Sequence, residues 1–198
     1  MTDIKILEQK VRELTGDKRY NHSLGVRDEA MKLAERYGAD IQKAEIAGLV
    51  HDCVKDLKSA ALRELSVKLG VKLDKVVKHE EKLMHSHIGA YYVKVILGVE
   101  DEDIFDAVYY HTTGKKKMPL LSKIIYVADF TEVNRSFPGV EQLRELSYQN
   151  LDNAMLEGLN YTINKLLTNG KMIHSDTVKA RNHLIKKQKK MERWLNEY

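Results

Sequence analysis

The chain has 198 residues, of which 43% are hydrophobic and 31% charged, with two prolines and a single cysteine. This length and hydrophobic content predict one compact domain over 1–198, and the scarcity of helix breakers favours an all-α fold. Cys53 has no internal disulfide partner, which predicts a reducing, cytoplasmic location. The N-terminal segment has no apolar signal core, and no stretch reaches the roughly 20 apolar residues of a membrane span, so we expect no membrane partner.

The net charge is +4, and much of the excess lies in the C-terminal stretch "IKKQKKMERW". A basic face on a terminal helix is typical of a solvated surface, which is the interpretation we favour. A phosphate-bearing partner such as a nucleic acid is the alternative.

Two helices are predicted in the first third of the chain. Residues 17–38 carry apolar side chains at helical spacing and end in a glycine, a common helix stop. Residues 39–57 follow, with an aspartate as the N-cap. His22 would lie in the first turn of the first helix, and His51 and Asp52 near the C-terminal end of the second.

The remaining helices are expected over 59–70, 86–98, 101–114, 118–133, 140–169 and 176–196. His111 would end the helix over 101–114, and "GKKKMP" after it reads as a loop. The segment 118–133 contains a β-branched run typical of a buried strand, but Pro119 suits a helix start. We therefore predict a single-domain helical bundle, with its main motifs in 18–135 and C-terminal helices in 140–198.

Imidazole and carboxylate side chains interrupt several apolar segments. Together they suit divalent Fe, Mn, Zn or Co, whereas one cysteine rules out a thiolate site. Asp129, between apolar neighbours, would be costly to bury unless it is coordinated or hydrogen-bonded. Taken singly, each histidine is more often an ordinary hydrogen-bonded residue than a ligand. Taken together, the residues leave a metal site and a structural role both open. The set comprises His22, His51, Asp52, His85, His87, His111 and Asp129.

The order of these residues resembles a known family. An isolated His, a His-Asp pair and a distant Asp are similar to the ligands of HD-domain metal-dependent phosphohydrolases. The blocks "RYNHSLGV", "GLVHDCVKD", "LMHSHIGA", "VYYHTTG" and "YVADFTEVNR" resemble the YqeK-type bacterial branch, as does the tail "IHSDTVKARN". That branch splits diadenosine tetraphosphate symmetrically into two ADP. The resemblance thus implies an HD-type helical fold and a dinucleoside tetraphosphate substrate.

The resemblance also implies roles for individual residues. A principal cation, iron with Mn, Co or Zn as alternatives, would be bound by His22, His51, Asp52 and Asp129. His85 and His111 would contact phosphate or a second metal, and His87 would have no role in the site. The two-residue spacing between His85 and His87 leaves open that their roles are exchanged.

The expected reaction is metal-assisted phosphoryl transfer. A metal-bound hydroxide would attack an inner phosphorus, with ADP as the leaving group. Asp52 would help accept the proton of the water, and His111 or His85 would protonate the leaving oxygen or bind phosphate.

Further side chains are candidates for contacts with the anionic substrate. Lys55 lies on the helix face of His51 and Asp52, and is a candidate catalytic residue. Arginines suit bidentate phosphate contacts, hydroxyls can donate to phosphate, and tyrosines can stack on adenine. Solvated surface charges, helix caps and core packing are the alternatives. The candidates for substrate binding, beyond the histidines above, are Arg19, Ser23, Thr112, Arg135, His174 and Ser175, with Tyr109 and Tyr110 for stacking.

Two other functions stay open at this point. One keeps the metal site but changes the substrate, to another nucleotide hydrolysed by an HD-domain phosphatase or phosphodiesterase. The other is a non-enzymatic helical protein whose basic C-terminal face binds nucleic acid, which we consider less favoured. The sequence also leaves a homodimer open.

Overall fold

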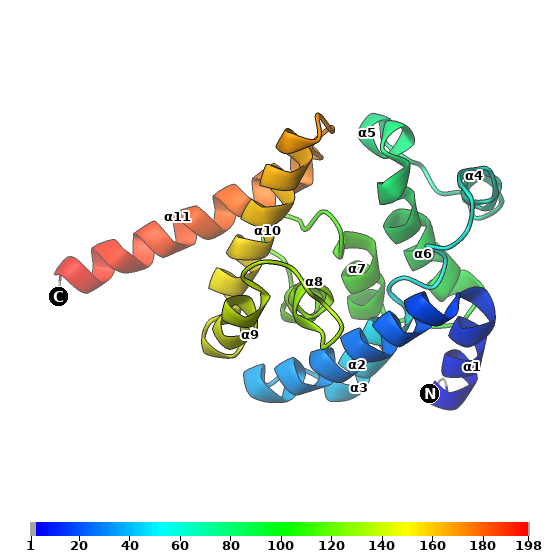
Figure 1. Ribbon diagram of the computed structural model, residues 1–198, viewed down its shortest axis with the longest axis horizontal. Coiled ribbons are helices and arrows are strands. Elements are labelled where there is room, and N and C mark those ends of the chain that lie inside the picture. The colour runs from blue at the N-terminus through cyan, green and yellow to red at the C-terminus, as the bar shows by residue number, and fades with distance from the viewer. Residues whose placement is uncertain (1–2, 198) are drawn as a thin grey trace.

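The computed structural model describes residues 3–197 and contains no strand within them (Figure 1). The predicted all-α class is therefore confirmed for this part of the chain. One contiguous cluster of buried apolar side chains extends from Leu7 to Leu184. In chain order the helices are α1 (Ile4–Leu14), α2 (Asp17–Tyr37), α3 (Ile41–Val50), α4 (Ser59–Lys68), α5 (Lys75–His79), the 3-10 helix η1 (Glu81–Leu83), α6 (Met84–Val95), α7 (Glu102–Tyr110), α8 (Leu120–Thr131), α9 (Val140–Gln149), α10 (Leu151–Thr168) and α11 (Ser175–Glu197).

Helices α2 and α3 form a tightly packed pair along one side of the molecule (Figure 1). Gly48 permits their close approach, because a Cβ atom at this position would lie 2.7 Å from the Cα of Arg27. Real Cβ atoms do not approach a backbone atom so closely, so a larger residue would push the helices apart. The contact brings the end of α3 close to the N-terminal half of α2, where His22 lies.

Helix α8 lies in the centre of the molecule and packs against α2, α3, α7 and α10 (Figure 1). Its residues 124–128 are all at most 2% exposed. A helix that is apolar on every side is typical of a core position, which explains why its β-branched run also resembles a buried strand. Asp129 directly follows this run, so its carboxylate is held inside the protein.

The helix predicted over 140–169 is in fact two helices. It breaks at Asn150, whose side chain accepts a hydrogen bond from the backbone N–H of Asn153 at 3.0 Å and so caps α10. An asparagine side chain can accept a hydrogen bond from a backbone N–H in this way. It therefore favours the start of a new helix over the continuation of the old one. The structure also contains helices α1 and α5, which we did not predict, and α6 begins at Met84 rather than at residue 86.

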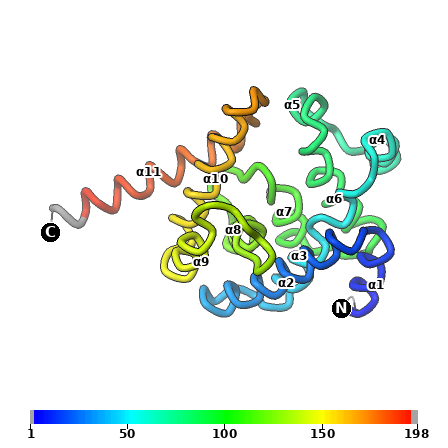
Figure 2. The backbone as a smooth tube through the Cα atoms, in the orientation of Figure 1, coloured from blue at the N-terminus to red at the C-terminus, as the bar shows by residue number. Residues whose placement is uncertain are grey.

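Helix α11 is the longest helix and runs away from the body toward the C-terminus (Figure 2). Its first half packs against α10, whereas Met191 farther along is 55% exposed. None of the helices in residues 3–197 combines the length and the apolar character needed to span a bilayer.

Candidate metal centre

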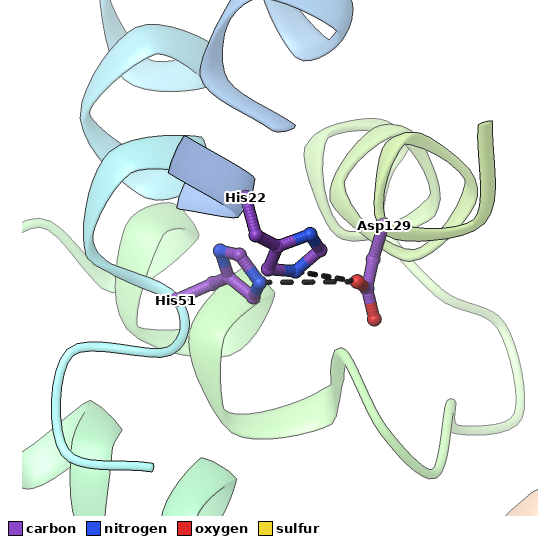
Figure 3. Close-up of side chains that lie close together, drawn as sticks. All are labelled: His22, His51 and Asp129. Carbon is purple, nitrogen blue, oxygen red and sulfur yellow. Dashed lines mark ion pairs between the residues drawn. The ribbon is translucent and has the colours of Figure 1, made fainter. Parts of the chain in front are cut away.

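Two histidines and two aspartates from three separate segments meet in the interior. Asp129 Oδ1 on α8 lies 3.0 Å from His22 Nε2 on α2 and 4.0 Å from His51 Nε2 (Figure 3). Asp52 Oδ2 lies 3.7 Å from His22 Nε2 and 3.5 Å from His51 Nε2. All four side chains are buried. The four metal ligands expected from the family resemblance are thus brought together by the fold.

The His-Asp pair lies just beyond α3 rather than within its last turn. The helix ends at Val50, and residues 51–56 continue as successive turns. Hydrogen bonds from Cys53 N to Val50 O and from Lys55 N to Asp52 O hold these turns. The sequence predicted that Lys55 lies on the same face as Asp52. It does so although the helix has ended, because successive turns also bring residues three positions apart close together.

The outer ring nitrogens of the two central histidines are anchored by hydrogen bonds. His51 Nδ1 lies 2.8 Å from the carbonyl oxygen of Gly48, which can only accept, so Nδ1 carries the proton. His22 Nδ1 lies 3.1 Å from Glu132 Oε1 and donates to this carboxylate. When neutral, each ring therefore carries its lone pair on Nε2, which faces the aspartates. This arrangement is typical of metal-ligating histidines. Although burial opposes protonation, the contacts with the Asp129 and Glu132 carboxylates raise the pKa of His22, so without a metal this ring favours the protonated form.

A second group of side chains adjoins the first on the other oxygen of Asp52. Asp52 Oδ1 lies 3.1 Å from His85 Nε2 and 3.2 Å from His111 Nε2, and these two nitrogens are 3.1 Å apart. His111 donates its Nδ1–H to the carbonyl oxygen of Val108 at 2.7 Å. Its Nε2 lone pair therefore faces an anionic oxygen, which is unfavourable unless a proton or a cation lies between them.

Three basic side chains border the buried carboxylates. Arg19 and Lys55 donate to Asp52 Oδ2 at 2.8 and 2.9 Å, and Arg135 pairs with Asp129. The two carboxylates are 0% and 13% exposed at the side chain, whereas the three cations are 26–36% exposed. The cations therefore lie between the buried aspartates and solvent, on the side from which an anion would approach.

Burial and charge act against each other at this centre. Burial alone would raise the pKa of the Asp52 carboxyl, but the adjacent His51 ring and the ammonium group of Lys55 hold it well below its usual range. Burial likewise opposes ionisation of Asp129, and its contact with His22 keeps the pKa low. The pKa of His51 is lowered by burial. The site thus combines ionised carboxylates with a neutral imidazole, the protonation states needed for metal binding.

The donor set fits a divalent cation. The Nε2 atoms of His22 and His51 are buried and have no hydrogen-bond partner within residues 3–197, although a carboxylate oxygen lies 3.0 Å from one of them. Two groups at this centre have ligand atoms within 4.8 Å of one another: His22, His51 and Asp129, and His51, Asp52 and His111. A third such group, Asp74, His87 and His174, lies outside this centre. Buried nitrogens without a hydrogen bond are costly, and coordination would satisfy them. Nitrogen and oxygen donors together suit a transition metal.

His87 lies in a neighbouring cluster rather than beside Asp52. Its ring is 4.2 Å from that of Tyr109 and 6.1 Å from that of His174, between ring centroids. His174 donates from Nε2 to Asp74 Oδ2 at 2.7 Å. Its Nδ1 accepts a hydrogen bond from the backbone N–H of Asp176 at the start of α11. The geometry therefore favours His85 over His87 at the centre. Tyr109 also contacts Tyr110, in an aromatic cluster rather than as a free stacking face.

The three hydroxyl candidates do not contact the central cluster. Ser23 is fully buried, and its hydroxyl has no hydrogen-bond partner among the described residues. The Thr112 hydroxyl lies 2.9 Å from that of Ser86. Ser175 begins α11 and is exposed, with Lys179 at 3.3 Å from its hydroxyl. Substrate contacts by Ser23, Thr112 and Ser175 stay predictions.

Sequence reasoning missed Glu132, which is 1% exposed beside His22. Its second oxygen, Oε2, accepts the backbone N–H of Asn134 at 2.6 Å. A Cβ atom at Gly25 would lie 2.4 Å from this oxygen, so only glycine leaves room for the carboxylate. The available signal was the position of Glu132 three residues after Asp129, which would place both side chains on one side of a continuing helix, although α8 ends at Thr131 and Glu132 follows it.

Comparisons with known proteins agree with this geometry. The family described as HD domain matches residues 19–134. A protein of Halalkalibacterium halodurans named "Bis(5'-nucleosyl)-tetraphosphatase, symmetrical" is 40% identical over 181 residues, covering 91% of this chain and 96% of the relative. A protein of Bacillus subtilis with the same name is 38% identical, covering 88% and 94%.

A solved structure is also similar. The crystal structure of a predicted HD superfamily hydrolase involved in NAD metabolism, from Clostridium acetobutylicum, shares 39% sequence identity with a TM-score of 0.90. It matches 94% of this chain and 99% of that protein. The HD-domain match and the buried His and Asp cluster together indicate a divalent-metal site. The chain therefore belongs to the HD-domain family, in the same group as the proteins named symmetrical bis(5'-nucleosyl)-tetraphosphatase.

Proposed function

We propose that this protein is a metal-dependent hydrolase that cleaves diadenosine tetraphosphate symmetrically into two ADP. The observation that carries the proposal is the convergence of His22, His51, Asp52 and Asp129, with both imidazole Nε2 atoms facing the carboxylates, inside an HD domain. The names of the two relatives, each covered over more than nine-tenths of its length, support the substrate. They also favour an enzyme over a nucleic-acid-binding protein.

His22, His51, Asp52 and Asp129 would hold the principal cation. Bound there, a divalent metal supplies an activated water and neutralises charge on the phosphates. We propose iron, with Mn, Co or Zn as alternatives, because mixed imidazole and carboxylate donors suit these metals. Asp52 also contacts His85 and His111 through its second oxygen, so its carboxylate links the two halves of the site.

The basic residues would bind the tetraphosphate. Arg19, Lys55 and Arg135 are partly exposed, and each already contacts a buried carboxylate oxygen. When a cation neutralises those carboxylates, the guanidinium and ammonium groups can contact phosphate oxygens instead. This places positive charge where negative charge develops during cleavage.

His85 and His111 are the candidates for proton transfer. His111 is held by its Nδ1–H on the Val108 carbonyl, which leaves Nε2 toward Asp52. A proton on Nε2 of His111 or His85 would be donated to the leaving oxygen of ADP, and Asp52 would take up the proton of the attacking water.

Product analysis tests this proposal. Purified protein, as isolated and after metal stripping and reloading, is incubated with diadenosine tetraphosphate, and the nucleotides are separated. We expect ADP as the sole product, loss of activity on stripping, and recovery on reloading. Asp129→Asn should abolish activity, whereas Asp176→Asn, at the start of α11, serves as a matched control. Formation of ATP and AMP would disprove symmetrical cleavage.

The same preparation also tests the alternative substrates. A nucleotide panel at equal concentration ranks diadenosine tetraphosphate against mononucleotides and cyclic nucleotides, and we expect the dinucleotide to react fastest. Faster hydrolysis of any other nucleotide would keep the metal site but change the assigned function. Cys53, a buried free thiol, supports our proposal that the protein works in the reducing cytoplasm.

A further inference from the structure

A cleft of about 380 Å³ opens between the loop before α8, the helix α10 and the first half of α11. Its apolar side is formed by Met118, Met155 and Leu184, which are all buried. Gly114 lies close to this apolar side, since a Cβ there would lie within 3.4 Å of Met118, Met155 and Ala180. Helix α10 packs against both α8 and α11 in this region (Figure 1). The volume falls within the range of about 300–1,000 Å³ typical of small-molecule sites.

The polar side of the cleft is uniformly basic. Within the part of the chain that the structure describes, no acidic side chain lines it, and the polar lining residues are Lys115, Lys117, Lys123, His183 and Lys187.

Two acids outside the lining neutralise part of this charge. Asp152 pairs with Lys123 and Lys187, each at 2.6 Å, and Asp106 pairs with Lys115 at 2.5 Å. Lys117 has no ion-pair partner among the described residues, nor does its neighbour Lys116.

Burial and the basic side chains lower the pKa of a neighbouring histidine. Burial lowers the pKa of His183, and the positive charges of Lys116, Lys117 and Lys123 lower it further. Cations that repel protonation of a nearby histidine would attract an anion for the same reason.

The cleft shares no residue with the metal centre but is connected to it. The segment from His111 to Pro119 runs from the metal centre to the cleft, where it contributes Lys115, Lys117 and Met118. Helix α8 makes a second connection, with Lys123 in the cleft and Asp129 in the metal centre.

We propose that this cleft is a second nucleotide site, which binds a nucleoside diphosphate apart from the catalytic centre. The base would lie against Met118, Met155 and Leu184, because methionine sulfur packs favourably on aromatic rings. The phosphates would contact Lys117 and Lys123, which line the cleft, and the charge of Lys116 nearby would add to the attraction. A ligand bound there would contact the segment that leads back to His111, so it could regulate the catalytic centre.

ADP binding to the full-length protein tests the proposal without relying on catalysis. Equilibrium dialysis is performed on His51→Ala, which disrupts the metal centre, and on Asp129→Asn as a second background in case the first does not fold. We expect ADP binding to persist in both. In either background, Lys116→Glu with Lys117→Glu should weaken binding roughly tenfold or more. Lys68→Glu, an exposed lysine on α4, is the matched control and should have no effect.

Comparison of ligands and photolabelling give independent readouts. We expect ADP to bind more tightly than adenosine or inorganic pyrophosphate, because only ADP contacts both sides of the cleft. An 8-azido-ADP probe should label peptides that contain Met118, Met155 or Leu184. Equal binding of pyrophosphate and ADP would refute a nucleotide site. Unchanged ADP affinity in the double lysine variant, or labelling confined to peptides of the metal centre, would refute its location.

Discussion

Replacing Glu132 tests whether a residue that is not a proposed metal ligand controls metal affinity through its contact with His22. The carboxylate accepts two hydrogen bonds, from His22 Nδ1 at 3.1 Å and from Asn134 N at 2.6 Å, and is 1% exposed. Glu132→Gln keeps the size but has only one acceptor oxygen for these two donors. If the amide oxygen faces Asn134, the amide NH2 group faces His22 and favours the tautomer with the proton on Nε2. That tautomer cannot bind a metal through Nε2.

The expected magnitudes follow from these contacts. One unsatisfied buried donor costs about 1–3 kcal/mol, so we expect the metal-free Glu132→Gln protein to lose free energy of unfolding in this range. Loss of the orienting partner of a histidine ligand lowers metal affinity by about 10–100-fold. This corresponds to about 1.4–2.7 kcal/mol less stabilisation when metal is added.

The assay measures metal affinity and stability separately. Competition with a chelator gives the affinity, and urea unfolding with and without metal gives the free energies. The matched control is Glu29→Gln, because Glu29 also joins α2 to α8, through Thr131 at 3.4 Å, but does not contact His22. Two outcomes would show that the Glu132 carboxylate does not orient His22. One is an equal fall in metal affinity in Glu29→Gln, and the other is an unchanged metal affinity in Glu132→Gln.

Three further predictions follow from the geometry. Gly25→Ala would place a Cβ 2.4 Å from Glu132, so we expect a loss of about 1–3 kcal/mol in urea unfolding and weaker metal binding; wild-type values for both would contradict the packing argument. Burial lowers the pKa of His87 to about 4, so its contribution to stability is complete above its unfolded pKa of about 6.5 and falls as the pH drops toward 4. The free energy of unfolding should change by up to about 3 kcal/mol over this pH range, and by less in His87→Gln. An equal change in both proteins would exclude His87 as the cause. Arg135→Lys keeps the charge near Asp129 but loses the planar guanidinium, so we expect KM for diadenosine tetraphosphate to rise more than kcat falls, and the reverse pattern would argue against substrate binding.

Local sequence patterns were sufficient for the elements that carry most of the site. Apolar residues at helical spacing predicted α2 and α3, and Pro119 correctly indicated that the buried run before Asp129 is a helix. The prediction failed at Asn150, where an asparagine inside a continuous apolar pattern caps a new helix. Helical spacing depends on contacts a few residues apart, so it identifies helices better than their ends.

The residue types alone, imidazoles and carboxylates in apolar segments, left a metal site and a structural role both open, and the resemblance to HD-domain phosphohydrolases implied the metal centre before any distance was known. Only the tertiary structure decided which of them meet. His85 and His87 both lie on α6, yet His85 lies 3.1 Å from Asp52 whereas His87 packs against Tyr109. Their spacing in the sequence cannot separate them, because the choice depends on how α6 packs against its neighbours.

The cleft between α8, α10 and α11 was likewise invisible in the sequence, where its lysines read as part of a loop and of a solvated helix face. The sequence by itself therefore predicted most of the helices through short-range periodicity, and its residue types supplied the candidate ligands. The arrangement of side chains from distant segments, including Glu132 behind His22, was decided by tertiary packing, because it depends on contacts between residues about 110 positions apart.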